Sequence, residues 1–131
     1  MTEENDGDAG KNLRALTRIV NEFRTVESDL AMSYAAVFLY VARHEQENRD
    51  APSISDISDN IGLVSPTVSR SCKALGDQRV GAGRVGETKS AGSRMALKLF
   101  EKVPDPEDLR VTRWKLSAKG RGLLARLQDH L

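Results

Sequence analysis

The sequence predicts an α+β domain that is mainly α-helical and carries one small β-hairpin, and three observations support this. In four segments apolar residues recur at intervals of three and four, the period of an amphipathic helix. Residues 110–116 instead alternate with a period of two, as a strand does, after a turn rich in proline and acidic residues. Serine, proline and glycine mark the ends of two short helices between residues 53 and 76.

Length and composition fit one globular domain. The chain has 131 residues, 39% of them hydrophobic and 30% charged, and a chain of this size can bury a core without disulfides or metals. No apolar run approaches the roughly 18 residues of a membrane span, and the N-terminus has no basic, apolar signal sequence. We therefore expect a cytoplasmic protein without a membrane partner. Its one cysteine, Cys72, excludes an internal disulfide and a multi-cysteine metal site.

The charge is divided between the two halves of the chain. The net charge of +1 favours no particular partner. However, residues 1–65 hold 6 Lys/Arg against 12 Asp/Glu, whereas residues 66–131 hold 14 against 7. A basic half suggests a face that meets a polyanion such as nucleic acid, although solvated surfaces also divide charge in this way by chance.

The N-terminal part predicts a tail and two helices. Residues 1–10 are acidic and polar, which is typical of a disordered tail before a domain at 11–131. A helix from residue 12 to Val26 follows, and Leu30 to His44 is apolar nearly all round, as in a buried central helix. The apolar residues of the first helix share one face: Leu13, Leu16, Ile19, Val20 and Phe23.

Residues 53–76 predict a helix-turn-helix. Ser53 with Asp56 three residues later resembles a capping box that opens a short helix. Gly62 suits the left-handed position at the end of that helix. Ser65 is a good N-cap for the next helix, with Pro66 at its first position. Two short helices joined by a few residues with glycine form this motif.

The second of these helices has the composition of a DNA-recognition helix. It contains no acidic residue, and we expect Val64, Val68, Cys72 and Leu75 to line its buried face. The other side carries groups suited to base edges and phosphates. They are Ser65, Pro66, Thr67, Ser69, Arg70 and Lys73. An ordinary solvated helix is the alternative interpretation.

Residues 77–94 predict a flexible basic insert, rich in glycine. Gly81 to Gly86 spells G-x-G-x-x-G, but that motif indicates a nucleotide site only between a strand and a helix, and here it follows a helix. DNA contact and an insert without a specific role both remain open. The candidate contacts are Arg79, Arg84, Lys89 and Arg94.

Residues 95–116 predict a β-hairpin, and a hairpin after a helix-turn-helix is a wing. Its strands are 95–103 and 110–116. In the second strand Trp114 lies on one face, as core of the wing base rather than a stacking platform, and Arg113 and Lys115 lie on the other. A C-terminal helix follows at 117–131, in which Gly120 and Gly122 are expected to cost up to ~1 kcal/mol each relative to alanine.

The chain resembles the MarR family of winged helix-turn-helix transcriptional regulators. The family's wing motif is Asp-x-Arg, five residues, Leu-Thr, two residues and Gly; here the same spacing holds Asp108, Arg110, Leu116, Ser117 and Gly120, with serine for threonine. The resemblance covers roughly residues 26–78 and 97–124. This chain departs from the pattern by about 19 inserted residues before the wing and by a short last helix.

The resemblance implies a winged-helix homodimer on a palindromic operator, joined through its first and last helices. It implies that Arg110 enters the minor groove and that Asp108 holds it by a salt bridge; a purely structural ion pair is the alternative. A narrow minor groove attracts arginine. It also implies a small-molecule effector of phenolic type. We further expect Lys73, Arg113 and Lys115 to bind phosphate.

The sequence therefore favours sequence-specific binding of double-stranded DNA by a transcriptional repressor. The alternative is a winged-helix module that binds another protein through the acidic tail or the insert. No nucleophile or cofactor motif indicates an enzyme, and we expect no cofactor. His44 and His130 lack the spacing of metal ligands. Cys72 is expected to be a packed small hydrophobe rather than a redox sensor.

Overall fold

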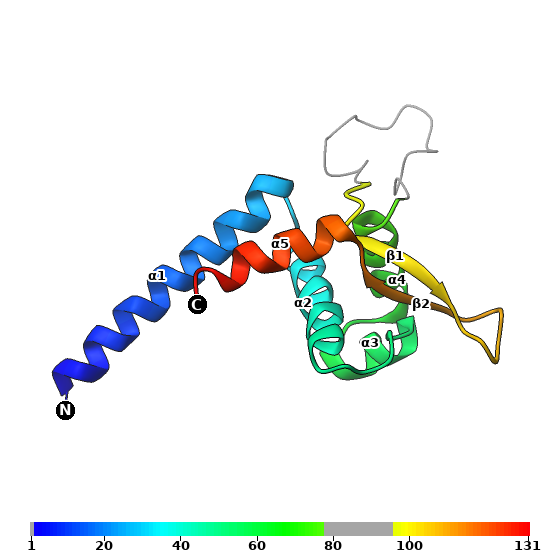
Figure 1. The fold of residues 1–131 in the computed structure, drawn as a ribbon, viewed down its shortest axis with the longest axis horizontal. Helices are drawn as coiled ribbons and strands as arrows, with labels where there is room; N and C mark the ends of the chain where they lie inside the picture. Colours follow the sequence, from blue (N-terminus) through cyan, green and yellow to red (C-terminus); the bar gives the residue numbers. More distant parts are fainter. Residues whose placement is uncertain (1, 78–95) are drawn as a thin grey trace.

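The computed structural model describes residues 2–77 and 96–131. Within them it contains five helices and one antiparallel hairpin, which confirms the mainly helical α+β prediction (Figure 1). No helix of this part of the chain is long and apolar enough to cross a membrane. The elements are α1 (Thr2–Val26), α2 (Met32–Gln46), α3 (Ile54–Ile61), α4 (Ser65–Leu75), β1 (Phe100–Pro104), β2 (Thr112–Leu116) and α5 (Ala118–Gln128).

Helix α1 begins at Thr2, so the predicted disordered tail at residues 1–10 is wrong over residues 2–10. The sequence has no proline there to interrupt a helix, and acidic residues are favoured near a helix N-terminus. Of the predicted apolar face of α1, only Phe23 is buried, whereas Leu13 is 64% and Leu16 56% exposed. Ile19 is partly buried against the core, and the rest of the face is not covered by the described residues of the chain.

Helix α2 is the centre of the core. Val37, Phe38 and Val41 are fully buried in it. The prediction of burial all round is correct for one side only, because Met32 and Leu39 are exposed on the other. A row of aromatic rings runs from α1 through α2 to the hairpin. Ring centroids are 5.6 Å apart for Phe23–Phe38, 6.1 Å for Phe38–Phe100 and 6.2 Å for Phe100–Trp114.

The predicted helix-turn-helix is confirmed as α3 and α4. Ser53 and Asp56 form both halves of the capping box, and Gly62 ends α3 with a left-handed backbone (φ 75°). The N-cap of α4 is Val64 rather than Ser65, since the Val64 carbonyl accepts the first helical bond, from the Val68 N–H at 3.1 Å. Val64 is consequently 66% exposed, and its predicted burial is wrong.

The first wing strand was predicted from residue 95, which lies outside the described residues; among those described, residues 96–99 are not strand and β1 starts at Phe100. The preceding residues bond to the end of α4: the Leu97 N–H donates to the Ala74 carbonyl at 3.0 Å, and the Leu99 N–H to the Leu75 carbonyl at 2.7 Å. Lys98 between them has a left-handed backbone (φ 59°). The N–H groups of Leu97 and Leu99 donate to the end of α4 and are not free to donate to a partner strand, and the ladder begins at Phe100.

The wing hairpin is anchored to the chain before α3 as well as to α2. Its register runs from Phe100 opposite Leu116 to Pro104 opposite Thr112. The Trp114 N–H donates to the Pro52 carbonyl at 3.0 Å. The Trp114 side chain is buried, as predicted for the wing base. The wing is therefore seated on the core at its base and projects at its tip (Figure 1).

Candidate nucleic-acid interface

Helix α4 has one buried and one solvent-facing side. Val68, Cys72 and Leu75 are fully buried against the core. Arg70 and Lys73 are exposed on the other side. The remaining candidates are exposed or half-buried: Ser65, Pro66, Thr67 and Ser69. The structure thus brings the predicted recognition residues together on one accessible helix.

At the wing tip the Asp108 carboxylate binds the Arg110 side chain. The Arg110 Nε donates to Asp108 Oδ1 at 3.1 Å and Nη2 donates to Oδ2 at 3.3 Å, while the Arg110 backbone N–H reaches Oδ1 at 3.0 Å. These bonds from Arg110, first from its side chain and then from its backbone, hold the pKa of the Asp108 carboxyl below its ordinary value. The Arg110 side chain is still 90% exposed. A two-pronged carboxylate contact fixes the plane of a guanidinium that faces solvent.

The turn that carries this pair is organised by Asp105. Its carboxylate accepts bonds at Oδ1 from the backbone N–H of Glu107 at 2.8 Å and of Asp108 at 3.1 Å. Asp105 is only 8% exposed. We did not predict this residue as part of the site, although an aspartate before Pro106 in a turn is typical of side-chain-to-backbone bonding.

Arg113, which was predicted to bind phosphate, faces protein groups in the structure. Its Nε donates to Asp105 Oδ2 at 2.9 Å. Its Nη1 donates to the Ala51 carbonyl at 2.9 Å and to Asp56 Oδ2 at 3.3 Å. The side chain is 29% exposed. The period of two along the strand predicts the correct face for Arg113. Acceptors in residues 51–56 lie on that face and bind the guanidinium.

Lys115 remains at the wing surface. Its Nζ lies 3.8 Å from Glu101 Oε1 on the neighbouring strand, and both side chains are about half exposed. Pairs of this kind contribute little to stability, so Lys115 remains available for a phosphate. The candidate insert residues Arg79, Arg84, Lys89 and Arg94, and the G-x-G-x-x-G segment, lie outside the described residues.

Cys72 is packed in the core, as expected for a small hydrophobe. Burial raises the pKa of its thiol to about 12. Because the thiolate is the reactive species, we expect the native protein to resist a chromogenic disulfide reagent at pH 7–8 and to react at once when unfolded in urea. Comparison of the two labelling rates checks this. Fast labelling of the native protein would show that the thiol is accessible.

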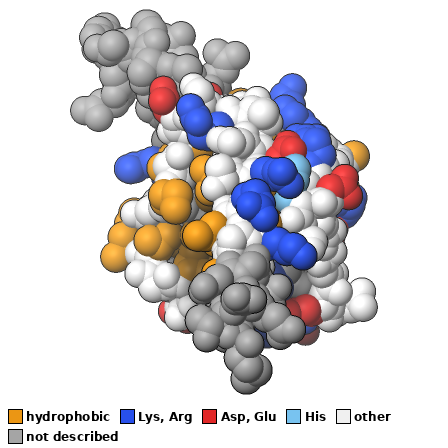
Figure 2. All heavy atoms as spheres, turned by 90° about the vertical axis from the view of Figure 1, so that its left-hand side faces the viewer, with side chains coloured by type: hydrophobic (Ala, Val, Ile, Leu, Met, Phe, Trp, Pro, Cys, Tyr) orange, Lys and Arg blue, Asp and Glu red, His pale blue; other side chains and the backbone are white. Residues whose placement is uncertain are grey.

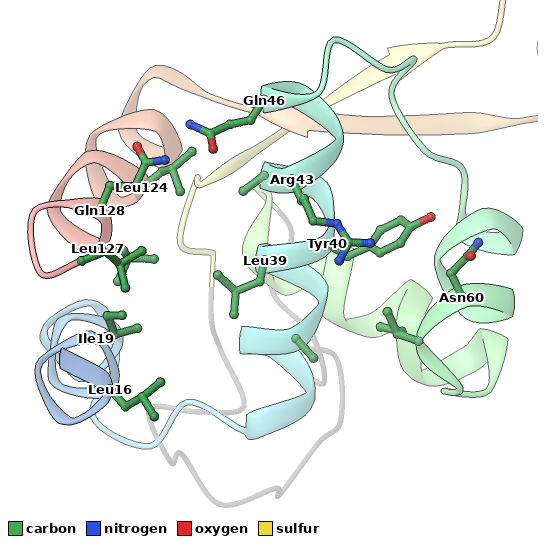
Figure 3. A pocket seen from close by; sticks show the side chains of 14 residues that line it. Leu16, Ile19, Leu39, Tyr40, Arg43, Gln46, Asn60, Leu124, Leu127 and Gln128 are labelled. Atoms are coloured by element: carbon green, nitrogen blue, oxygen red, sulfur yellow. The ribbon is translucent and has the colours of Figure 1, made fainter. Parts of the chain in front are cut away.

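A groove lies between α1, α2 and α5. It has a volume of about 600 Å³, and Leu16, Leu39 and Leu127 point toward it from the three helices (Figure 3). Viewed from the α1 side, the surface shows hydrophobic side chains gathered beside a group of Lys and Arg (Figure 2).

Glu22 links α1 to the C-terminal part of the chain. Its carboxylate lies 3.1 Å from Arg126 in α5 and 2.9 Å from His130.

No protein-family model matches the sequence, and no curated protein matches it at a significant level. Solved structures do match over nearly the whole chain. The first is a mutant of the Staphylococcus aureus protein MepR bound to an oligodeoxyribonucleotide, with a TM-score of 0.59 and 16% identity over 98% of this chain and 72% of that one. The chain has a MarR-like winged-helix fold.

Two further structures with this MarR-like fold come from other organisms. A MarR transcriptional regulator from Methanosarcina mazei has a TM-score of 0.56 and 14% identity, over 99% of this chain and 75% of that one. PcaV, a transcriptional regulator from Streptomyces coelicolor in complex with its natural ligand, has a TM-score of 0.50 and 20% identity, over 95% and 70%. At these identities the similarity shows the shared fold.

Proposed function

We propose that this protein is a transcriptional regulator that binds double-stranded DNA sequence-specifically, as a homodimeric repressor on a palindromic operator. The observation that carries the proposal is the wing tip. Asp108 holds the guanidinium of Arg110 in a fixed plane while the side chain stays 90% exposed. An exposed arginine so oriented suits the negative potential of a narrow minor groove. The fold shared with a DNA-bound MepR supports the same function.

Helix α4 supplies the residues that would read the sequence. Thr67, Ser69 and Arg70 stand near the N-terminal half of the helix, where side chains of a recognition helix reach base edges. Lys73 stands one turn further on and Lys115 lies on the wing, so both suit phosphates. The N-terminus of α4 adds a partial positive charge toward the nucleic acid.

The apolar surface of α1 supports the homodimer. Leu13, Leu16 and Val20 are about half exposed or more along one stripe of this helix. A contiguous exposed apolar patch on a soluble domain marks an interaction site, and a second copy would cover it. Two recognition helices about 34 Å apart would then reach successive major grooves on one side of the duplex.

The groove between α1, α2 and α5 supports a small-molecule effector. Its volume of about 600 Å³ lies within the roughly 300–1,000 Å³ of small-molecule sites. It adjoins the same apolar stripe, so an occupant there would meet the helices that we assign to the dimer.

Selection of bound sequences from random duplex DNA tests the proposed function. We expect enrichment of a palindrome with about ten base pairs between half-site centres. Absence of binding at every salt concentration would favour the alternative, a winged helix that binds another protein, because phosphate contacts make DNA binding steeply salt-dependent.

Substitutions of Arg70 and of Lys73 are expected to affect DNA binding in different ways. Arg70→Ala should cost about 1–3 kcal/mol of operator binding and relax the preference at one base pair, because a base contact is lost. Lys73→Ala should weaken all sequences alike and reduce the salt slope by about one. Titrations of both variants on the selected operator and on shuffled DNA check this. Equal losses on both DNAs for both variants would contradict the division.

A further inference from the structure

We propose that Arg113 is a positioning residue for DNA recognition, which fixes the wing tip, and with it Arg110, relative to the recognition helix. This inference rests on the proposed function. It assigns Arg113 a role without DNA contact, through three protein acceptors in two separate segments of the chain. They are Asp105 in the wing turn, Ala51 before α3 and Asp56 within α3.

Toward the wing tip, the path runs through Asp105. One oxygen of this carboxylate receives the Arg113 guanidinium at 2.9 Å. The other receives the backbone N–H groups of Glu107 and Asp108. Asp108 in turn holds the side chain and backbone N–H of Arg110. A shift of Asp105 therefore moves the backbone that carries the Asp108–Arg110 pair.

Toward the recognition helix, the path runs through Asp56. The same Asp56 oxygen that faces Arg113 at 3.3 Å also accepts the Ser53 backbone N–H at 3.0 Å in the capping box of α3. Ser53 and Arg113 form a backbone bridge as well. Since α3 leads through the Gly62 turn directly into α4, Arg113 connects the wing to the helix-turn-helix.

The anchor matters because a two-stranded hairpin is marginally stable by itself. Its tip would otherwise sample many orientations, and a side chain that must be ordered on binding lowers affinity. Arginine suits the task because its rigid fork can serve several acceptors at once, whereas lysine offers a single point of charge. Arg113 uses two of its nitrogens on three acceptors.

Hydrogen exchange tests the anchor without DNA. We expect Arg113→Gln to accelerate exchange of the Glu107 and Asp108 amides at least tenfold, while core amides of α2 keep their protection. The matched control is Arg121→Gln, which removes an arginine that is likewise ion-paired, to Glu45 at 2.7 Å, but lies on α5. Unchanged exchange at Glu107 and Asp108 in Arg113→Gln would overturn the anchor.

A double-mutant cycle tests the role in recognition. Arg113→Gln alone should weaken operator binding on the order of tenfold, and in the Arg110→Gln background it should add little, because it acts through Arg110. Its salt slope should match that of the parent. A direct phosphate contact predicts the opposite, an additive loss with a salt slope lower by about one, and that result would overturn the proposal.

Arg113→Lys keeps the charge and guards against a folding defect in Arg113→Gln. We expect it also to loosen the Glu107 and Asp108 amides and to weaken operator binding several-fold. Full affinity in Arg113→Lys would show that charge alone is needed and would overturn the positioning role. If the parent protein binds no duplex DNA, the proposed function and the recognition role both fail, while the exchange experiment still decides whether Arg113 holds the wing.

Discussion

Replacing Gly120 with alanine is expected to lower the free energy of unfolding by about 3 kcal/mol, the upper end for an overpacked site. A Cβ at this position of α5 would stand 2.2 Å from the Leu99 carbonyl oxygen and 3.4 Å from the Leu116 Cβ. The carbonyl cannot yield easily, because it accepts the Ser117 N–H at 2.9 Å. Urea denaturation of parent and variant measures the loss.

Gly122 provides the matched control two residues along the same helix. A Cβ there meets nothing within 4 Å. Gly122→Ala should therefore stabilise the protein by up to ~1 kcal/mol through helix propensity alone. Opposite signs at the two positions are the expected result. A stabilising Gly120→Ala would show that α5 does not pack against Leu99 as closely as the structure has it.

Removing the wing-tip arginine or its carboxylate partner should weaken operator binding. Arg110→Ala is expected to cost about 1–3 kcal/mol, the usual range for a specific arginine contact. Asp108→Ala should cost about 0.5–1.5 kcal/mol, because Arg110 would then have to be immobilised on binding. Fluorescence anisotropy on a selected operator at fixed salt measures both losses.

Glu107 is the control for charge. It is exposed in the same turn, and Glu107→Ala removes the same negative charge without releasing Arg110. Simple electrostatics predicts that both carboxylate variants tighten binding to a polyanion. Positioning predicts that Glu107→Ala tightens it slightly while Asp108→Ala weakens it. If Asp108→Ala also tightens binding, the carboxylate does not hold Arg110 for DNA.

Local signals in the sequence were enough to predict the helix-turn-helix and the wing. Ser53, Asp56 and Gly62 act within their own turns, so spacing alone predicts their contacts. The salt bridge between Asp108 and Arg110 was implied by the resemblance to the MarR family, and it forms between residues only two positions apart. Serine is a preferred helix N-cap, so a cap at Ser117 could also be predicted from the sequence. Its hydroxyl accepts the Gly120 N–H at 3.0 Å.

Contacts between distant segments were not predictable in the same way. The alternation along β2 predicts the face on which Arg113 lies. It does not predict that residues 51–56, some sixty positions earlier in the chain, bind the side chain there. Helix propensity predicts that Gly120 weakens α5, but Leu99 packs against this position and leaves no room for a side chain. The apolar residues of α1 share one face, as predicted, but of that face only Phe23 is buried, because periodicity does not tell whether the same chain or another covers a face.

The ratio of dissociation constants for a selected palindrome and for its shuffled duplex, measured at one physiological salt concentration, tests the central claim most directly. The claim is that α4 and the Asp108–Arg110 wing tip form a sequence-specific DNA interface. It predicts at least about a thousandfold preference for the palindrome, the lower end for specific DNA-binding proteins. A ratio near one would contradict it.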